Sequence, residues 1–300
     1  MSSLRKCYFI IFIPALLSCQ KLIELEEQEF TEQLVLYCLM SVDEKPSWAM
    51  SHTSIELTHT LDILDSSRTY EGVNGAQIAL YENDSFIEYA EESTILGSYS
   101  FRRNIKANAT YKIMVNANGY PPVSTEHTTP KILNNVEIRT ISPKPVGSLT
   151  EPNLYRLTYE IDDPLGANYY VADFNIVYTT KNGETLFPVK FWEVSSSLDP
   201  LEEKDTTRVF SDENFDGLHH SRTIEFNYAN EDNFKSDHID FVLTLMHVSE
   251  SYYLYHRTLE LQSNSNEYRF TEPVQVYSNI NGGIGLFASY SKSYAKWRVK

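Results

Sequence analysis

The chain of 300 residues carries 41 acidic and 25 basic side chains, a formal net charge of −16. We expect no nucleic-acid binding, because that function draws its affinity from clustered Lys and Arg, and the sequence contains no basic block. With 42% hydrophobic and 13% aromatic residues, the chain can bury one large or two modest cores, and its length suggests roughly two domains.

The N-terminus has the pattern of a secretory signal. Arg5 and Lys6 precede the uncharged, apolar stretch 8–17. At about ten residues this stretch is too short for a stable transmembrane helix and fits the core of a signal peptide. We therefore predict that residues 1–18 are a signal peptide.

The cleavage region resembles a bacterial lipobox, in which a cysteine follows a branched and a small residue. The four residues in question are Leu16, Leu17, Ser18 and Cys19. In a lipobox the cysteine sulfur receives diacylglycerol, and two or three acyl chains of the palmitate type anchor a protein firmly. We predict lipidation at Cys19 and attachment to a membrane, with an ordinary secretory signal as the alternative.

The mature chain then begins with an acidic tether. Residues 19–32 contain five glutamates, whose mutual repulsion favours an extended linker. Cys7 leaves with the signal peptide and Cys19 carries lipid, so Cys38 has no partner for an intrachain disulfide and is expected to be a small buried side chain.

Residues 33–130 show short apolar or alternating runs separated by turn residues, which favours a β-sandwich. The predicted strands are residues 34–40, 54–64, 76–81, 86–89, 98–101, 110–116 and 123–127. The segments 75–81, 97–101 and 110–120 resemble the small transthyretin-like or carboxypeptidase-regulatory sandwich. The side chains expected to point inward are those of Tyr99, Phe101, Tyr111, Ile113 and Val115.

Residues 131–300 are predicted to form a second β-sandwich that bears one helix. A proline-rich break at 128–152 precedes it. The predicted strands are residues 136–141, 155–161, 169–178, 185–191, 223–228 and 239–248. Ser249 is a suitable N-cap for a helix over 249–261, where aromatic and apolar residues recur at helical spacing. The fold class expected is mainly β, with two sandwiches in tandem.

An acidic turn is the only candidate for a metal site. Asp212, Asn214 and Asp216, followed by Gly217, have the D-x-N-x-D-G spacing of a calcium loop. Position twelve of an EF-hand loop is Thr223 rather than the required glutamate. The favoured interpretation is therefore a structural Asx-type loop, with calcium binding as the alternative and no other cofactor expected.

Catalytic patterns are weak. Ser289 and Lys292 match S-x-x-K without its companion motifs. His219 and His220 are adjacent, so in a strand they point to opposite faces and make poor joint ligands. We expect no enzyme activity.

Tyrosine is the one compositional excess, at 21 residues. Aromatic side chains are enriched at binding surfaces and also fill sandwich cores. Both interpretations remain open for the candidate ligand or partner contacts, which are Tyr169, Tyr170, Trp192, Tyr252, Tyr253 and Tyr255.

The order of landmarks resembles a family of Bacteroidetes outer-membrane lipoproteins, the domain of unknown function family 4249. The resemblance is carried by the lipobox and by segments 162–170, 210–217, 249–255 and 272–287. It implies a lipoprotein on the periplasmic or cell-surface face of the outer membrane, often encoded beside a TonB-dependent transporter. It implies no known reaction. We expect a non-enzymatic accessory or ligand-capture partner of such a transporter. The alternatives are a hydrolase or glycan-processing enzyme with a site built from scattered loops, and a structural or adhesive surface protein.

Overall fold

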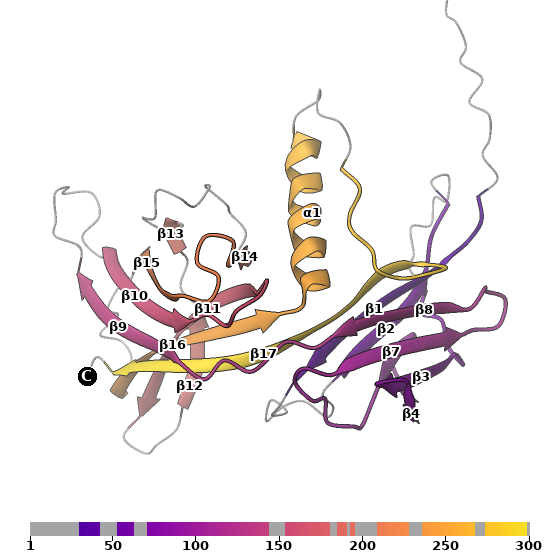
Figure 1. Ribbon diagram of the computed structural model, residues 1–300, viewed down its shortest axis with the longest axis horizontal. Helices are drawn as coiled ribbons and strands as arrows, with labels where there is room; N and C mark the ends of the chain where they lie inside the picture. The colour runs from indigo at the N-terminus through magenta and orange to yellow at the C-terminus, as the bar shows by residue number, and fades with distance from the viewer. Residues whose placement is uncertain are drawn as a thin grey trace, which may run out of the picture. The chain divides into compact units, whose positions relative to one another are not determined.

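Strands form almost all of the regular structure in the computed structural model (Figure 1). The model describes residues 30–42, 53–62, 71–143, 154–180, 185–190, 193–195, 209–227, 236–267 and 274–298. The lipobox, Cys19, most of the tether and Trp192 lie outside these residues. The predicted mainly-β class with one helix is confirmed.

The N-terminal half contributes eight strands. They are β1 (Leu34–Ser41), β2 (Thr53–His59), β3 (Gln77–Glu82), β4 (Ser85–Tyr89), β5 (Glu91–Glu92), β6 (Ser98–Ser100), β7 (Thr110–Asn116) and β8 (Val123–Thr128). The predicted strand 54–64 is wrong at residues 60–62, because the ladder of β2 with β1 ends where Leu34 pairs with His59, and residues 63 and 64 lie outside the described residues.

The C-terminal half contains the remaining strands and the helix. The strands are β9 (Val136–Pro143), β10 (Leu154–Asp162), β11 (Tyr169–Thr180), β12 (Thr185–Lys190), β13 (Glu193–Ser195), β14 (Val209–Ser211), β15 (His219–Asn227), β16 (Ser236–Val248) and β17 (Ile284–Arg298). Helix α1 spans Glu250–Glu267, six residues beyond the predicted end at 261.

These strands form one long sheet and two smaller sheets. The long sheet has the order β12-β11-β16-β17-β1-β2-β6-β5, with β14 also paired to β11. The N-terminal sheet, β4-β3-β7-β8, encloses one apolar core with the long sheet, and the C-terminal sheet, β13-β15-β10-β9, encloses another. Tyr99, Phe101, Tyr111, Ile113, Val115 and Cys38 are all buried in the first core, as predicted.

Strand β17 belongs to both sandwiches (Figure 1). Its first half pairs in parallel with β1, and its second half pairs antiparallel with β16. Tyr290 takes part in both ladders, where it lies opposite Ser41 on one side and Val248 on the other. Phe287 lies in the first core and Ala295 in the second. Residues 32–300 accordingly form a single compact unit.

The parallel pairing requires glycine at residue 285. Gly285 lies opposite Leu36 and has φ +127°, and a Cβ there would sit 2.0 Å from the Leu36 carbonyl oxygen. An L-side chain is disfavoured at this φ, and no side chain fits beside a backbone oxygen at that distance. Gly285 therefore sets how closely β17 approaches β1.

Beyond the end of β16, side chains form hydrogen bonds with the backbone of β17 on the edge that faces away from β1. Asn279 accepts a hydrogen bond from Phe287 N at 2.9 Å and donates one to Phe287 O at 2.8 Å, so its amide replaces a neighbouring strand. Ser251 Oγ also donates to Phe287 O, and Ser249 bonds both backbone groups of Ser289. These bonds satisfy backbone groups that burial would otherwise penalise.

The segment between β8 and β9 is tied to the same strand. Ser291 Oγ donates to Lys131 O at 2.7 Å, and Ser293 Oγ donates to Leu133 O at 2.7 Å. His247 Nδ1 lies 2.8 Å from Lys131 O. The connection thus runs along β17 from one core to the other. The division of the chain at residue 130 into two domains stays a prediction.

Replacement of Gly285 by alanine tests the close approach of β17 to β1. We expect Gly285→Ala to lower the free energy of unfolding by about 3–5 kcal/mol, because it combines a disfavoured φ with a backbone clash. Chemical denaturation measures this loss. Gly119→Ala is the matched control, since Gly119 has φ +88° with nothing within 4 Å of its Cβ position, and it should cost only about 1–2 kcal/mol. Equal losses of unfolding free energy in the two variants would contradict the close approach of β17 to β1.

Candidate functional site

Two loops lie side by side, and each connects a strand of the long sheet to a strand of the C-terminal sheet. The loop 163–168 joins β10 to β11, and the loop 212–218 joins β14 to β15. Their ends are held by ladder pairs, because Asp162 pairs with His219 and Tyr169 with Ser211. We call residues 163–168 and 212–218 the crossing loops.

Three carboxylates meet between the crossing loops. Asp163, Asp212 and Asp216 each offer an oxygen within 4.8 Å of the others, and the first two side chains are buried. Two of the three residues predicted from the calcium-loop spacing therefore come together. Asn214 is exposed, and Asp163 from the other loop lies with the two aspartates.

Hydrogen bonds to backbone amides account for the position of each carboxylate. Asp212 Oδ2 accepts from Asn168 N at 2.8 Å and from Asn168 Nδ2 at 2.9 Å. Asp163 Oδ2 accepts from Gly217 N at 2.7 Å, and Asp216 Oδ1 accepts from Gly166 N at 2.8 Å. Every one of these bonds joins one crossing loop to the other, so the cluster locks the two loops together.

The electrostatics of the cluster centre on Asp163. Burial raises the pKa of Asp163, and the neighbouring Asp212 and Asp216 charges raise it further, against hydrogen bonds from Tyr170 and Gly217 that lower it. Tyr170 is fully buried, and its hydroxyl donates to Asp163. Three close carboxylates are also a chemically suitable oxygen donor set for a hard cation. Calcium binding stays a prediction, while the loop-locking role is visible in the bonds themselves.

The tyrosines proposed as contacts lie in different environments. Tyr170 is fully buried among core aromatic rings, next to Phe210 and His247, and is inaccessible to a ligand. Tyr252 packs on His256, and Tyr255 meets Tyr37 edge to face. These three side chains pack within the fold, as in the core interpretation.

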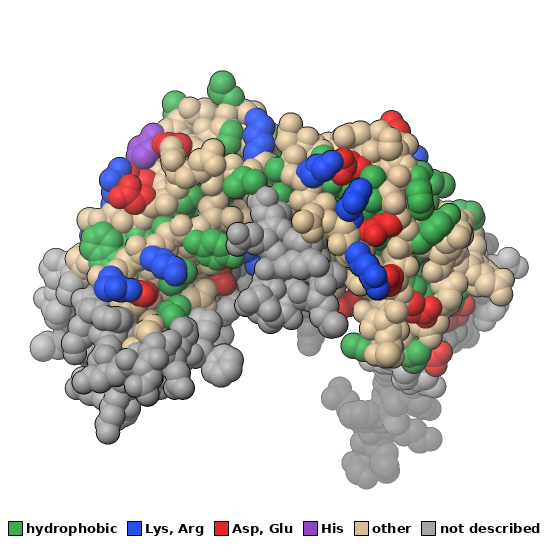
Figure 2. All heavy atoms as spheres, turned by 90° about the horizontal axis from the view of Figure 1, so that it is seen from below, with side chains coloured by type: hydrophobic (Ala, Val, Ile, Leu, Met, Phe, Trp, Pro, Cys, Tyr) green, Lys and Arg blue, Asp and Glu red, His purple; other side chains and the backbone are tan. Residues whose placement is uncertain are grey.

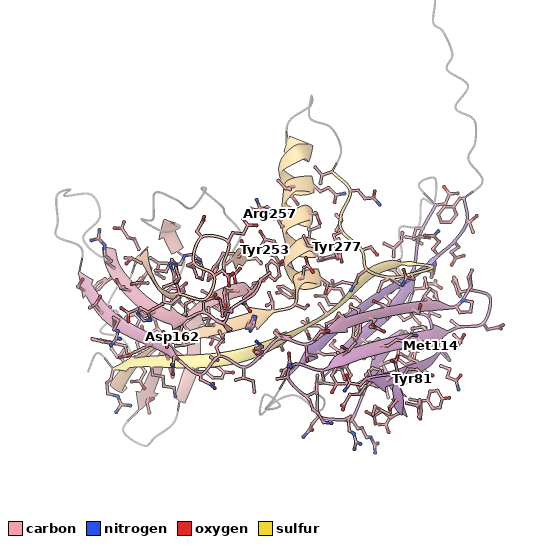
Figure 3. All side chains as sticks on the ribbon, in the orientation of Figure 1. Tyr81, Met114, Asp162, Tyr253, Arg257 and Tyr277 are labelled. Atoms are coloured by element: carbon pink, nitrogen blue, oxygen red, sulfur yellow. The ribbon has the colours of Figure 1, made fainter. Side chains whose placement is uncertain are left out.

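Tyr169 and Tyr253 form a half-buried stacked pair next to the crossing loops. Their ring centroids are 4.6 Å apart with an interplanar angle of 24°. Arg257 lies over the Tyr253 ring, 6.0 Å from its centroid. Figure 3 shows Tyr253 and Arg257 on one side of α1 and Tyr277 on the other. This pair joins the start of β11 to the first turns of α1.

His127 and Ser289 have the geometry of a base and a nucleophile, but the serine is out of reach of a substrate. His127 Nε2 lies 2.7 Å from Ser289 Oγ, within the range of a nucleophile–base pair. Ser289 is fully buried, and the His127 ring packs at 4.2 Å on Phe287. Among the described residues, His127 Nδ1 has no hydrogen-bond partner to orient it. The contact therefore fastens β8 to β17.

His219 and His220 diverge, as their adjacency in a strand predicts. His219 is exposed and bridges two carboxylates, with Nδ1 2.6 Å from Asp162 and Nε2 3.1 Å from Glu160. The Asp162 hydrogen bond raises the pKa of His219. His220 stacks on Phe215 at 3.9 Å.

Charges of both signs are interspersed on the face shown in Figure 2. The ion pairs of the described residues include Arg102 with Glu91 and Lys106 with Glu82. Within the described part of the chain, no helix is long and apolar enough to cross a membrane.

The family comparison covers nearly the whole chain. A family model described as Domain of unknown function (DUF4249) matches residues 21–295. A search of curated proteins found no match. The matched span includes the crossing loops, helix α1 and most of β17.

Loss of the Asp212 carboxylate tests the loop-locking role. Asp212→Ala leaves the buried backbone amide of Asn168 without its acceptor, and we expect the free energy of unfolding to fall by about 2–3 kcal/mol. Its exposed neighbour supplies the control, since Glu213→Ala should change stability by less than about 0.5 kcal/mol. Urea titrations at pH 7 measure both. An unchanged free energy of unfolding in Asp212→Ala would show that the cluster is not needed for the fold.

The pH dependence of stability tests the burial of the His127 ring. Burial lowers the pKa of His127 to about 3, so the folded protein keeps this ring neutral where the unfolded chain protonates it. Stability should therefore fall as pH drops from 6.5 towards 3, by up to about 1.4 kcal/mol per pH unit from this one group. His127→Gln should reduce that slope. The exposed His219 has a raised pKa, so His219→Gln should not reduce it, and equal slopes in His127→Gln and the unsubstituted protein would contradict the account.

Proposed function

The chain belongs to the family Domain of unknown function (DUF4249), and from this premise we propose that it is a lipid-anchored outer-membrane protein without catalytic activity. In this proposal it acts as an accessory or ligand-capture partner of a TonB-dependent transporter. The transporter partner follows from the gene context that the family resemblance implies, and the anchor follows from the lipobox ending at Cys19.

One observation carries the non-catalytic part of the proposal: the carboxylate cluster of the crossing loops and the His127–Ser289 pair are both committed to structural bonds. Asp163, Asp212 and Asp216 accept backbone hydrogen bonds between two loops. Ser289, which lies beside His127, is fully buried. A hydrolase requires a nucleophile or an acid–base pair that substrate can reach.

The exposed features of the fold favour recognition instead. Large apolar side chains stand on turns between strands, where a rigid sandwich positions loops for binding. Among them are Leu165, Leu218, Ile95 and Leu96, each more than half exposed. Apolar and aromatic contacts supply most of the free energy in protein interfaces.

Recovery of partners from the native membrane tests this function. We expect detergent extracts of the lipidated protein to contain a TonB-dependent transporter, and we expect Cys19→Ser to release the protein from the membrane and to lose the transporter. Cys38→Ser is the matched control, because Cys38 is buried in the first core and lies far along the chain from the lipobox.

Protease treatment of intact cells, run beside the extraction, reports which face of the membrane carries the protein. Cleavage of the exposed protein together with transporter recovery would support the accessory function. A protein that is recovered alone and is shielded inside the envelope would contradict it.

A further inference from the structure

The crossing loops expose two leucines next to each other. Leu165 is 81% exposed, the highest value among the large apolar side chains of the described residues, and Leu218 is 59% exposed. They come from different loops. The Leu165 side chain lies over Gly217, where a Cβ would be 2.5 Å from Leu165 Cδ2, and Leu218 O accepts a hydrogen bond from Asp163 N.

The loops that expose the two leucines are held in one conformation. Beneath the leucines, six hydrogen bonds join the two loops. Four run to carboxylates from Gly166 N, Asn168 N, Asn168 Nδ2 and Gly217 N, and two are backbone bonds from Asp163 N and Asp212 N. A loop that is ordered before binding loses little conformational entropy when it meets a partner. Exposed side chains on a rigid support are what a binding anchor requires, whereas a solvated loop gains nothing from apolar tips.

The exposed charged side chains of the crossing loops are both acidic. Glu213 and Asp216 are exposed, Asp163 and Asp212 are buried beneath them, and neither loop contains lysine or arginine. Tyr169 continues the surface from the first crossing loop, and its stacking on Tyr253 extends it to α1. Complementarity therefore calls for a partner with an apolar pocket and a basic rim.

We propose that the crossing loops, with Leu165 and Leu218 as apolar anchors, are the surface that docks on a protein partner whose apolar pocket is rimmed by lysine or arginine. The inference rests on the proposed function, in which that partner is the TonB-dependent transporter. Steering by opposite charge makes the contact sensitive to salt, because exposed charges are screened within about 10 Å at 0.1 M ionic strength.

Photo-crosslinking in intact cells tests the surface. The full-length, lipidated protein carries p-benzoylphenylalanine in place of Leu165, of Leu218 or of Leu96, and the probe is an epitope-tagged transporter that the unsubstituted protein recovers. Leu96 is the control because it is 69% exposed on the turn before β6, in the other sandwich. We expect adducts with the transporter from positions 165 and 218 and none from position 96.

A double variant tests the same surface without a crosslinker. Leu165→Ser with Leu218→Ser should reduce transporter recovery at least tenfold, while Ile95→Ser with Leu96→Ser should leave it unchanged. Because all four side chains are exposed, both variants should keep the melting temperature of the unsubstituted protein. Recovery should also fall as salt rises from 0.05 to 0.5 M.

The outcomes separate the surface from the function. Transporter adducts at position 96 alone, or full recovery by the Leu165→Ser, Leu218→Ser variant, would overturn the docking surface while the accessory function stands. Failure of the unsubstituted protein to recover any transporter would overturn the accessory function, and the docking surface would fall with it.

Discussion

The close parallel contact between β17 and β1 is the constraint on which the rest of the structure depends. It requires Gly285, because any side chain there meets the Leu36 carbonyl oxygen. Once β17 is seated, its later residues pair with β16 and carry the long sheet into the second sandwich. Ser249, Ser251 and Asn279 then complete its open edge. The C-terminal segment that most resembles the family is thus a structural element that joins two cores.

The same arrangement explains how a rigid surface arises on the crossing loops. The crossing loops run between the long sheet and the C-terminal sheet, so their ends are fixed by ladders in both. Carboxylates between the loops bond backbone amides and remove the remaining freedom. Acidic residues that suggest a metal loop by spacing therefore serve as loop ties, and the apolar tips above them are left to contact a partner. A lipid-anchored protein needs such a fixed surface, because its tether supplies reach but no orientation.

Local patterns predicted local structure well, and contacts between distant segments could not be predicted. Alternating apolar residues placed β7 at Thr110–Asn116 without error, and Ser249 marked the helix start because its oxygen caps the first turn. The calcium-loop spacing selected Asn214, since it assumes that all ligands come from one loop. Asp163 joins the cluster only because β14 pairs with β11, and no local signal reports that pairing. The pairing of β17 with both β1 and β16 could not be predicted for the same reason.

The central claim is that one shared strand makes the two sandwiches a single cooperative unit, and native-state hydrogen exchange tests it most directly. Ile113 lies in the core of the first sandwich and Leu157 in the core of the second, and both are fully buried. The account predicts that their amides exchange with the same free energy of opening, equal to that of global unfolding. A markedly lower opening free energy for one amide than for the other would show that the sandwiches unfold separately, and would contradict the claim.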